Sequence, residues 1–561
     1  MSHDKIAVPK YEMPTPASRG RADLAVGLAI AGFALLVSLR PAYEPDLWWH
    51  LAQGRETASG DFVRTNVFSV THPDYRQTYT PWLYDLAAYG LWTRGGSLAI
   101  QLWQALWLAL ALGATYGAAR VRAPASAAAA VILIGLFAIE PRAMPRPHVV
   151  SFAGVAGMVW LIERVRADGR AARLAWAVPL VGVWSNLHVE CVLGAALAGL
   201  FAMTEVVRPS TLTRREAVRA LGLATAAAAA TLANPYGWGV LQYLAENLMV
   251  PASLDIAELR PPYWPSYRGF FVFSTIAAAL IAFVRPRRTT IWDVTALGGA
   301  AALGLRFIRL TPLVVWAAAP VMAARLAVLV ARGVHPRALV ITAAAVAVAA
   351  SPVSVRHLVT DLDAGARAME PPQLFSRGAM GFIQTEGLDG PLFNSHNLGG
   401  YLAWHLYPRA RVFQDSRLQA YPPAHAEAIL QAAASQPAWD ALVSGVDWAV
   451  LSRPRPNRLS GAGRFPQADW ATVYWDEAVE VLVRRDSSHA DLAQRRAYRF
   501  LLPDRDPFLI AAGVNGPDGP AIRGEAARQR VENPDGDAGA MVRCLGGDQE
   551  SCAFVSRRPS R

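Results

Sequence analysis

Long apolar runs alternate with short polar segments over roughly the first 350 residues of the chain. A helix that crosses a bilayer needs roughly 20 mostly apolar residues. Eleven segments approach that requirement, at 22–40, 97–119, 124–139, 148–163, 172–187, 189–207, 217–233, 269–284, 290–305, 310–330 and 337–352. The pattern therefore predicts a polytopic, all-α membrane domain of about 11 transmembrane helices over 22–352, with a large first outside loop at 40–96.

The first apolar run follows a positively charged segment, as the apolar core of a signal peptide does. However, Arg40-Pro41 is a poor cleavage site, because signal peptidases require small residues there. We therefore expect a retained anchor that is preceded by a cytoplasmic segment, residues 1–21.

After residue 352 the apolar runs become too short to span a bilayer. Short apolar or β-branched runs lie at 392–394, 411–414, 448–451, 472–475 and 479–484, and helical patterns lie at 397–407 and 423–443. This alternation is typical of a small α/β domain, which we assign to 353–490, followed by a connecting segment at 491–514. Residues 515–561 are rich in Gly, Pro, Asp and Arg without a period, so we expect a largely disordered tail.

The distribution of charged residues predicts the orientation of the helices across the membrane. Only 17% of the residues are charged, against about 25% in a typical soluble chain. If the N-terminus is inside, every predicted inside loop is basic, as short cytoplasmic loops usually are. The net charge of +11 then reflects membrane topology, and we expect no nucleic-acid partner. The same orientation places the C-terminal domain outside, on the far side of the membrane from the cytoplasm.

The three cysteines bear weakly on that orientation. Cys191 lies in an apolar span, whereas Cys544 and Cys552 lie close together in the tail. In an oxidising compartment these two thiols could close a small loop, and two unbridged thiols in a polar tail are the equal alternative.

Candidate chemistry begins at the start of the first outside loop, which reads Glu44-Pro45-Asp46-Leu47-Trp48-Trp49-His50. Two tryptophans at headgroup depth are typical membrane anchors, but anchoring does not require a carboxylate beside the bilayer. We therefore single out Asp46, with a solvated loop acid as the alternative. No Walker loop, GxGxxG or HExxH sequence occurs, which removes the main motifs of nucleotide-binding proteins and zinc proteases.

Four outside arginines run against the charge bias of a membrane protein. They are Arg142, Arg146, Arg306 and Arg309, and the same predicted face carries His148, Asn186 and His188. The guanidinium fork suits phosphate, so an anionic ligand would explain these residues. The alternative is that the arginines pair with Glu140, Glu190 or lipid headgroups.

In the C-terminal domain, polar residues lie at the ends of predicted strands or the starts of predicted helices, where α/β sheets often bind ligands. They are Asn394, His396, Asn397, Asp415 and Arg417. Helix capping by the asparagines and a salt bridge between Asp415 and Arg417 would explain these residues equally well.

An ordered set of short motifs resembles a bacterial family of multi-spanning membrane proteins related to the GT-C glycosyltransferases, such as the dolichyl-phosphate-mannose protein mannosyltransferases and the aminoarabinose transferases. The motifs are PDLWWHLAQGRETASGDFVRTNVFSVTHP at 45–73, RPHVVSF at 146–152, WSNLHVE at 184–190, ANPYGWGVLQY at 233–243, AELRPP at 257–262, RFIRL at 306–310 and FNSHNLGGYLAWHLYPRARVFQDSR at 393–417. Together they extend over most of residues 22–485.

The resemblance implies a GT-C-like membrane glycosyltransferase that uses a polyprenyl-phosphate-linked sugar and an acceptor that is a protein, a lipid or a polysaccharide. Asp46 matches the acidic residue of the family's first outside loop and would act as the base, with inversion at the sugar carbon. Asp85 is the candidate for a second acid, although the family commonly has Glu-Trp-Leu where this chain has Tyr84-Asp85-Leu86. A Gly-Gly pair often follows the His of the WxNLH motif, and here Val189-Glu190 stands instead.

The remaining site residues form a pool for substrate binding. We assign to it Trp48, Trp49, His50, Arg142, Arg146, His148, Asn186, His188, Arg306 and Arg309. No metal ligand set is evident, and a divalent metal held by Asp46 and Asp85 is an alternative use of those two acids.

Two other functional classes stay open. One is a transporter or flippase for an anionic lipid or sugar, with the same arginines as its binding site. The other is a non-catalytic envelope assembly protein or sensor whose outside domain binds a partner.

Overall fold

The computed structural model describes residues 16–39, 44–248, 256–264, 266–285, 289–350, 374–453, 461–503, 507–534, 540, 543–544 and 552. Two compact units are present: Met1–Pro41 with Thr78–Arg367, and Ala42–Gln77 with Ala368–Arg561. The division corrects the expectation that the whole loop 40–96 belongs to the membrane domain, because residues 42–77 form one unit with the C-terminal part. The expected segment 1–21 lies mostly outside the described residues, and so does the first part of the expected domain at 353–490, residues 353–373.

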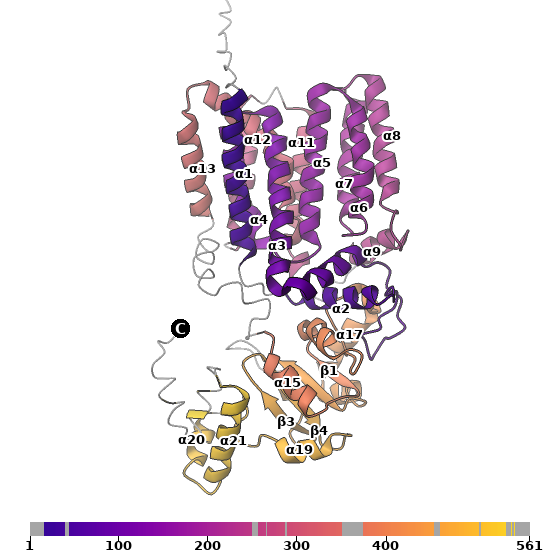
Figure 1. Cartoon of the computed structure of the whole chain (residues 1–561), viewed down its shortest axis with the longest axis vertical. Helices are drawn as coiled ribbons and strands as arrows, with labels where there is room; N and C mark the ends of the chain where they lie inside the picture. Colours follow the sequence, from indigo (N-terminus) through magenta and orange to yellow (C-terminus); the bar gives the residue numbers. More distant parts are fainter. Residues whose placement is uncertain are drawn as a thin grey trace, which may run out of the picture. The chain divides into compact units, whose positions relative to one another are not determined.

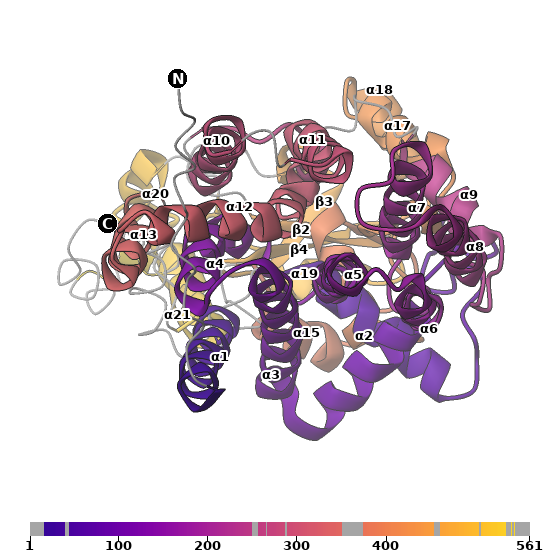
Figure 2. The ribbon, with the colours of Figure 1, turned by 90° about the horizontal axis from the view of Figure 1, so that it is seen from above.

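The first unit is a bundle of long helices that run side by side (Figure 1) and are seen end-on in Figure 2. They are α1 (Pro16–Ser38), α3 (Trp82–Arg122), α4 (Ala125–Ile139), α5 (His148–Asp168), α6 (Ala177–Trp184), α7 (Cys191–Val207), α8 (Arg214–Ala230), α10 (Arg268–Phe283), α11 (Ile291–Arg306), α12 (Leu313–Ala331) and α13 (Pro336–Ala350). A further helix, α9, spans Gly239–Leu248. Each predicted apolar span falls on one of the bundle helices, of which α6 is the shortest at 8 residues.

Five helices of the described residues are long and apolar enough to cross a membrane, and the chain is a multi-pass membrane protein. These five segments are Gly20–Ser38, Trp82–Arg122, Ala125–Arg142, His148–Asp168 and Ile308–Ala331. Four further apolar helices are shorter, so the count of eleven spans stays a prediction. The longest helix, α3, is broken at Gly96, where φ is 54°, a conformation that glycine adopts without a steric penalty.

Consecutive long helices run in opposite directions (Figure 1), so alternate connections meet at the same end of the bundle. The arginine-rich connections, such as those around 120–124 and 164–173, share one end. Within the first unit, the connections around 140–147, 185–190 and 307–312 share the other end. The alternation on which the orientation argument rests is thus present, while the side of the membrane that each end faces stays a prediction.

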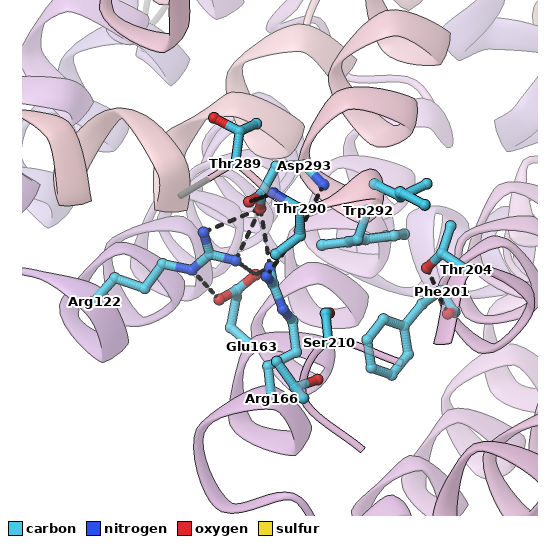
Figure 3. Close-up of polar contacts among 12 residues, drawn as sticks. Arg122, Glu163, Arg166, Phe201, Thr204, Ser210, Thr289, Thr290, Trp292 and Asp293 are labelled. Carbon is cyan, nitrogen blue, oxygen red and sulfur yellow. Dashed lines mark hydrogen bonds and ion pairs between the residues drawn. The ribbon is translucent and has the colours of Figure 1, made fainter. Parts of the chain in front are cut away.

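A buried ionic cluster joins three helices at the arginine-rich end (Figure 3). Arg122 on α3 and Arg166 on α5 both donate to Glu163 and to Asp293, the latter on α11. The two carboxylate side chains are only 2% and 4% exposed. Two cations and two anions balance, so this cluster is a structural tie between helices that the sequence analysis did not predict.

The second unit contains a mixed sheet with strand order β1-β2-β4-β3. Its strands are β1 (Leu392–Asn394), β2 (Trp448–Ser452), β3 (Trp470–Trp475) and β4 (Val479–Arg484). Strand β1 pairs with β2 in parallel, and the other two pairings are antiparallel. Its helices are α2 (Asp46–Ala58), α15 (Arg377–Thr385), α16 (Gly399–Leu406), α17 (Pro423–Ala432), α18 (Gln436–Leu442), α19 (Ala490–Arg496), α20 (Pro507–Gly513) and α21 (Gly519–Glu532). Four of the five predicted strands are thus present.

Two expectations about this unit are wrong. Residues 411–414 form no strand, because Val412 makes an isolated bridge to Ser69 of the first-loop segment rather than joining the sheet. A helix, α21, lies at Gly519–Glu532, within the expected disordered tail. It is ordered because Ile522 and Ala526 are buried in an apolar cluster with Trp475 and Leu501. Further along the tail, Cys544 and Cys552 form a disulfide.

Candidate functional site

Asp46 is the first residue of α2, in the second unit. A carboxylate at this end of a helix is stabilised by the helix dipole. Its backbone N–H donates to Glu44 Oε1 at 3.0 Å, and its side-chain Oδ1 accepts a hydrogen bond from the hydroxyl of Ser416. The residue is half-buried. Asp46, the predicted base, is thus held through both its backbone N–H and its side chain. The sequence analysis missed Ser416 as a partner of Asp46, although Ser416 lies within the motif at 393–417.

The loop that carries Ser416 is fixed by a fully buried ion pair. Arg417 donates to Asp415 with Nη2–Oδ2 and Nε–Oδ1 distances of 2.6 and 2.9 Å, and both side chains are 0% exposed. Burial alone would raise the pKa of Asp415, but the charge of Arg417 outweighs it and lowers that pKa. Arg417 also donates to Asn66 Oδ1 at 2.6 Å, in the first-loop segment. The salt-bridge alternative for these two residues is confirmed.

A glycine pair lets helix α16 approach both partners closely. A Cβ on Gly399 would lie 2.1 Å from the carbonyl oxygen of Gln414, and one on Gly400 would lie 3.0 Å from the backbone nitrogen of Trp49. Only glycine leaves room for such approaches. The Gly-Gly sequence therefore brings the backbone around Asp46 and the backbone around Ser416 against the same helix.

The aromatic residues after Asp46 are buried. Trp48 is 0% exposed and packs edge-on against Tyr401 and Phe375, with ring centroids 5.0 and 5.6 Å apart. The rings of Trp49 and His50 lie 3.5 Å apart, and both residues are also buried. A substrate-lining role therefore finds no support for Trp48, whose ring belongs to the core of the second unit.

Asn394 is buried and holds the loop that leads to Ser416. His396 and Asn397 are exposed. The side chain of Asn394 accepts from the backbone N–H of Phe413 at 2.8 Å and donates to the carbonyl oxygen of Gln414 at 2.7 Å. It therefore fixes the loop before Ser416 rather than capping a helix.

A histidine pair that the sequence analysis missed joins the first-loop segment to α17. His72 Nε2 and His425 Nδ1 are 3.0 Å apart, and the His425 ring stacks on Tyr421 at 4.7 Å. Burial lowers the pKa of His425 to about 4 and also lowers that of His72. Both rings are therefore neutral near pH 7 and hydrogen-bonded to each other.

In the first unit, two of the predicted outside arginines converge on one carboxylate. Arg142 Nη2 lies 3.0 Å from Glu258 Oε1, and Arg146 donates to the same oxygen. Burial opposes the ionisation of Glu258, but the charges of Arg146 and Arg142 hold its pKa well below the usual range. The predicted alternative of ion pairing therefore holds for these arginines, with Glu258 as a partner that the sequence analysis did not name.

Two more predicted residues lie beside this pair. His148 donates from Nε2 to the carbonyl oxygen of Arg142 at 2.6 Å. Arg306 donates to the carbonyl oxygen of Leu259, next to Glu258, at 3.3 Å. The structure thus brings Arg142, Arg146 and Arg306 to residues 258–259, although these arginines lie far apart in the sequence.

His188 and Glu190 form a second polar group in the same unit. His188 Nδ1 is 2.6 Å from Ser151 Oγ and 3.5 Å from Glu190 Oε2. Both of these contacts use the same ring nitrogen of His188, Nδ1. The charge of Arg309 also acts on the carboxylate of Glu190.

Asp85 and Asn186 lie at the start of α3 and after α6. Asp85 is buried, at 1% exposure. Asn186 Oδ1 accepts from Trp82 Nε1 at 2.9 Å, and its amide donates to the carbonyl oxygen of Ala233 at 2.8 Å. Asn186 is therefore a structural link between three loops. No group of three or more His, Cys, Asp or Glu side chains arranged to hold a metal occurs among the described residues.

No protein-family model and no curated protein matches this sequence. Solved structures do. The oligosaccharyltransferase AglB from Archaeoglobus fulgidus, in complex with an inhibitory peptide and a dolichol-phosphate, aligns with a TM-score of 0.52 at 12% identity, covering 76% of this chain and 69% of that chain. Its apo form gives a TM-score of 0.51 at 11% identity, covering 77% and 69%.

ArnT from Cupriavidus metallidurans, bound to undecaprenyl phosphate, aligns at 17% identity with a TM-score of 0.46, covering 83% of this chain and 98% of that chain. AglB is a GT-C glycosyltransferase. At these identities the AglB alignments establish fold rather than activity. The chain is therefore a multi-pass membrane protein with the GT-C fold.

Proposed function

We propose that this protein is a membrane glycosyltransferase, which transfers a sugar from a polyprenyl-phosphate carrier to the hydroxyl of an acceptor. The GT-C fold supports the class of reaction. The AglB structure contains a dolichol-phosphate, which supports a lipid-phosphate donor. A donor with a long apolar tail also accounts for an active site in a protein of apolar helices.

The observation that carries the proposal is the carboxylate of Asp46, held at the start of α2 in a chain with this fold. Transfer requires a base, because an acceptor hydroxyl is a weak nucleophile until its proton is removed. In the proposed step the acceptor oxygen attacks the anomeric carbon while Asp46 takes its proton. The bond from that carbon to the phosphate oxygen breaks, and the phosphate leaves with the bonding electrons. One direct displacement inverts the sugar carbon.

We assign stabilisation of the leaving phosphate to the cations of the first unit. Arg142 and Arg146 converge on one oxygen of Glu258, and guanidinium groups bind phosphate through paired hydrogen bonds. Removing a preorganised donor from a developing oxyanion typically costs about 100-fold to 1,000-fold in rate. We therefore expect Arg142→Ala to lower kcat more than it raises KM.

Asp85 is proposed as the second acid. It is buried on α3, and a buried carboxylate of this kind is suited either to orienting the substrate or to holding a divalent metal. Added EDTA separates the two roles, because it lowers the activity of the wild type only if a metal is needed.

The proposed location is a bacterial inner membrane with the second unit in the periplasm. The arginine-rich connections at one end of the bundle support this orientation. The Cys544–Cys552 disulfide supports an oxidising compartment for the tail.

The test is the release of free polyprenyl phosphate from a panel of polyprenyl-phosphate sugars by the detergent-purified protein. Release from one member supports the proposal and identifies the donor sugar. If a labelled lipid binds but none is released over the panel, the protein is better described as a transporter or an assembly factor.

A further inference from the structure

We propose that Ser416 is a positioning residue for the catalytic carboxylate, so that the C-terminal part of the chain completes the site of the first-loop acid. This inference rests on the proposed function, because it gives Ser416 a task only if Asp46 acts as the base. The contact that carries it is the hydrogen bond from the hydroxyl of Ser416 to Asp46 Oδ1, over a sequence separation of 370 residues.

The surroundings of Ser416 are built to hold that hydroxyl in place. Its neighbours Asp415 and Arg417 form the fully buried ion pair, and Arg417 also donates to Asn66. On the other side, Gln414 is held through its backbone by Asn394. These contacts restrict the conformations of the loop on both sides of Ser416. The hydroxyl of Ser416 is therefore held in one position relative to Asp46.

Asp46, the partner of Ser416, is also held by several contacts. Asp46 is fixed at the first turn of α2, and its N–H is bonded to Glu44. Gly400 allows α16 to approach the backbone of Trp49 and Pro45, while Gly399 allows the same helix to approach Gln414 and Asp415. One helix thus sets the spacing between the backbone that carries the acid and the backbone that carries the hydroxyl.

The physical task of the hydroxyl is orientation. An aspartate side chain can rotate about two torsions, and a base has to point at the acceptor proton within hydrogen-bond reach. A donated hydrogen bond to Oδ1 restricts both torsions and so selects one orientation of the carboxylate. Errors of about 1 Å in such a group are known to cost about 100-fold in rate.

The experiment compares Ser416→Ala, Ser416→Thr, Asp46→Asn and Ser444→Ala in the full-length protein, with polyprenyl-phosphate sugar as the probe. Ser444 is the matched control, because its hydroxyl lies in the same unit and donates to the carbonyl oxygen of Ala441 at 3.0 Å. We expect Ser416→Ala to lower kcat about ten-fold with KM unchanged, the size expected for losing one hydrogen bond to a charged group. We expect Ser416→Thr and Ser444→Ala to stay within about three-fold of the wild type.

The outcomes distinguish failure of the positioning role of Ser416 from failure of the proposed glycosyltransferase function. Wild-type kcat in Ser416→Ala, together with an inactive Asp46→Asn, overturns the positioning role and leaves the proposed function standing. An equal loss in Ser416→Ala and Ser416→Thr also overturns it, because the threonine hydroxyl can still donate. Full activity in Asp46→Asn overturns both. Melting temperatures of all variants exclude a loss that comes from unfolding.

Discussion

Asp46, at the start of α2, accepts a hydrogen bond from Ser416, which lies 370 residues later in the chain. The two residues belong to one compact unit, made of Ala42–Gln77 and Ala368–Arg561. The first-loop acid is therefore supported by the C-terminal part of the chain. Any truncation that removes the C-terminal part also removes contacts that hold Asp46.

The close approach of α16 to residues 414–415 predicts that the stability of the protein is sensitive to any side chain added at Gly399. A methyl group there would meet the carbonyl oxygen of Gln414 at 2.1 Å and the Cβ of Asp415 at 2.5 Å. Because both atoms belong to a tightly held loop, we expect Gly399→Ala to lower the free energy of unfolding by about 3 kcal/mol or more.

Gly381 on α15 provides the matched control, since a methyl group added there would have no atom within 4 Å. We expect Gly381→Ala to be neutral or to stabilise by up to about 1 kcal/mol. Thermal unfolding of both variants, followed by tryptophan fluorescence, checks the pair. Equal melting temperatures would show that α16 does not make the close approach.

The ionic cluster in Figure 3 predicts a strong effect in the first unit. Glu163 accepts from Arg122 and Arg166, and its side chain is only 2% exposed. Glu163→Gln leaves two half-buried cations with one buried carboxylate, so we expect a loss of about 3 kcal/mol or more in the free energy of unfolding. Thermal unfolding in detergent measures it.

The control for that experiment is an ion pair at the surface. Asp168 pairs with Arg173, whose side chain is 41% exposed. Because water screens this pair, Asp168→Asn should cost no more than about 1 kcal/mol. A smaller loss in Glu163→Gln than in Asp168→Asn would contradict the role assigned to the cluster.

The His72–His425 pair predicts a pH dependence of stability. The folded protein resists protonation of His425 down to about pH 4, whereas an unfolded histidine takes up a proton near pH 6.5. The unfolded state therefore binds more protons between these values, and stability must fall as the pH is lowered from about 6.5 to about 4.

Replacing His425 with Gln removes its share of that slope. Melting temperatures of the wild type and His425→Gln between pH 4 and pH 8 give the comparison. We expect the two curves to converge toward low pH, and curves of equal slope would mean that the ring is not held neutral. Asp415 does not confuse the measurement, because its lowered pKa places its effect below the ordinary aspartate value of about 3.9.

The tail predicts a simple thiol count. Cys544 and Cys552 form a disulfide, and Cys191 is free and buried. Alkylation of the denatured protein without reductant should therefore label one of the three cysteines, and with reductant all three. Three labelled cysteines without reductant would contradict both the disulfide and the proposed oxidising location.

The sequence predicted best those elements whose signal lies within a single segment of the chain. Apolar runs predicted the positions of the long helices, because burial in a bilayer imposes the same requirement on each helix separately. Short β-branched runs likewise predicted the strands at 448–452 and 479–484. The arginine at 142 was predicted to face an anion from its charge alone, but its partner, Glu258, lies 116 residues away.

What the sequence could not show was pairing between distant segments. Val412 bridges Ser69 instead of joining the sheet, and Arg417 bonds Asn66, because the first-loop segment packs with the C-terminal part. Local periodicity carries no information on such partners. The same limit explains why Asp46 was singled out while Ser416 was missed.

The most direct test of the central claim is polyprenyl-phosphate release by wild type and by Asp46→Asn at matched melting temperature. The substitution keeps the size of the side chain and removes its ability to take a proton. We predict that wild type releases the lipid phosphate from one donor of the panel and that Asp46→Asn is at least about 1,000-fold slower, since a general base contributes about 100-fold to 10,000-fold. Release at the wild-type rate by Asp46→Asn would contradict the assignment of Asp46 as the base.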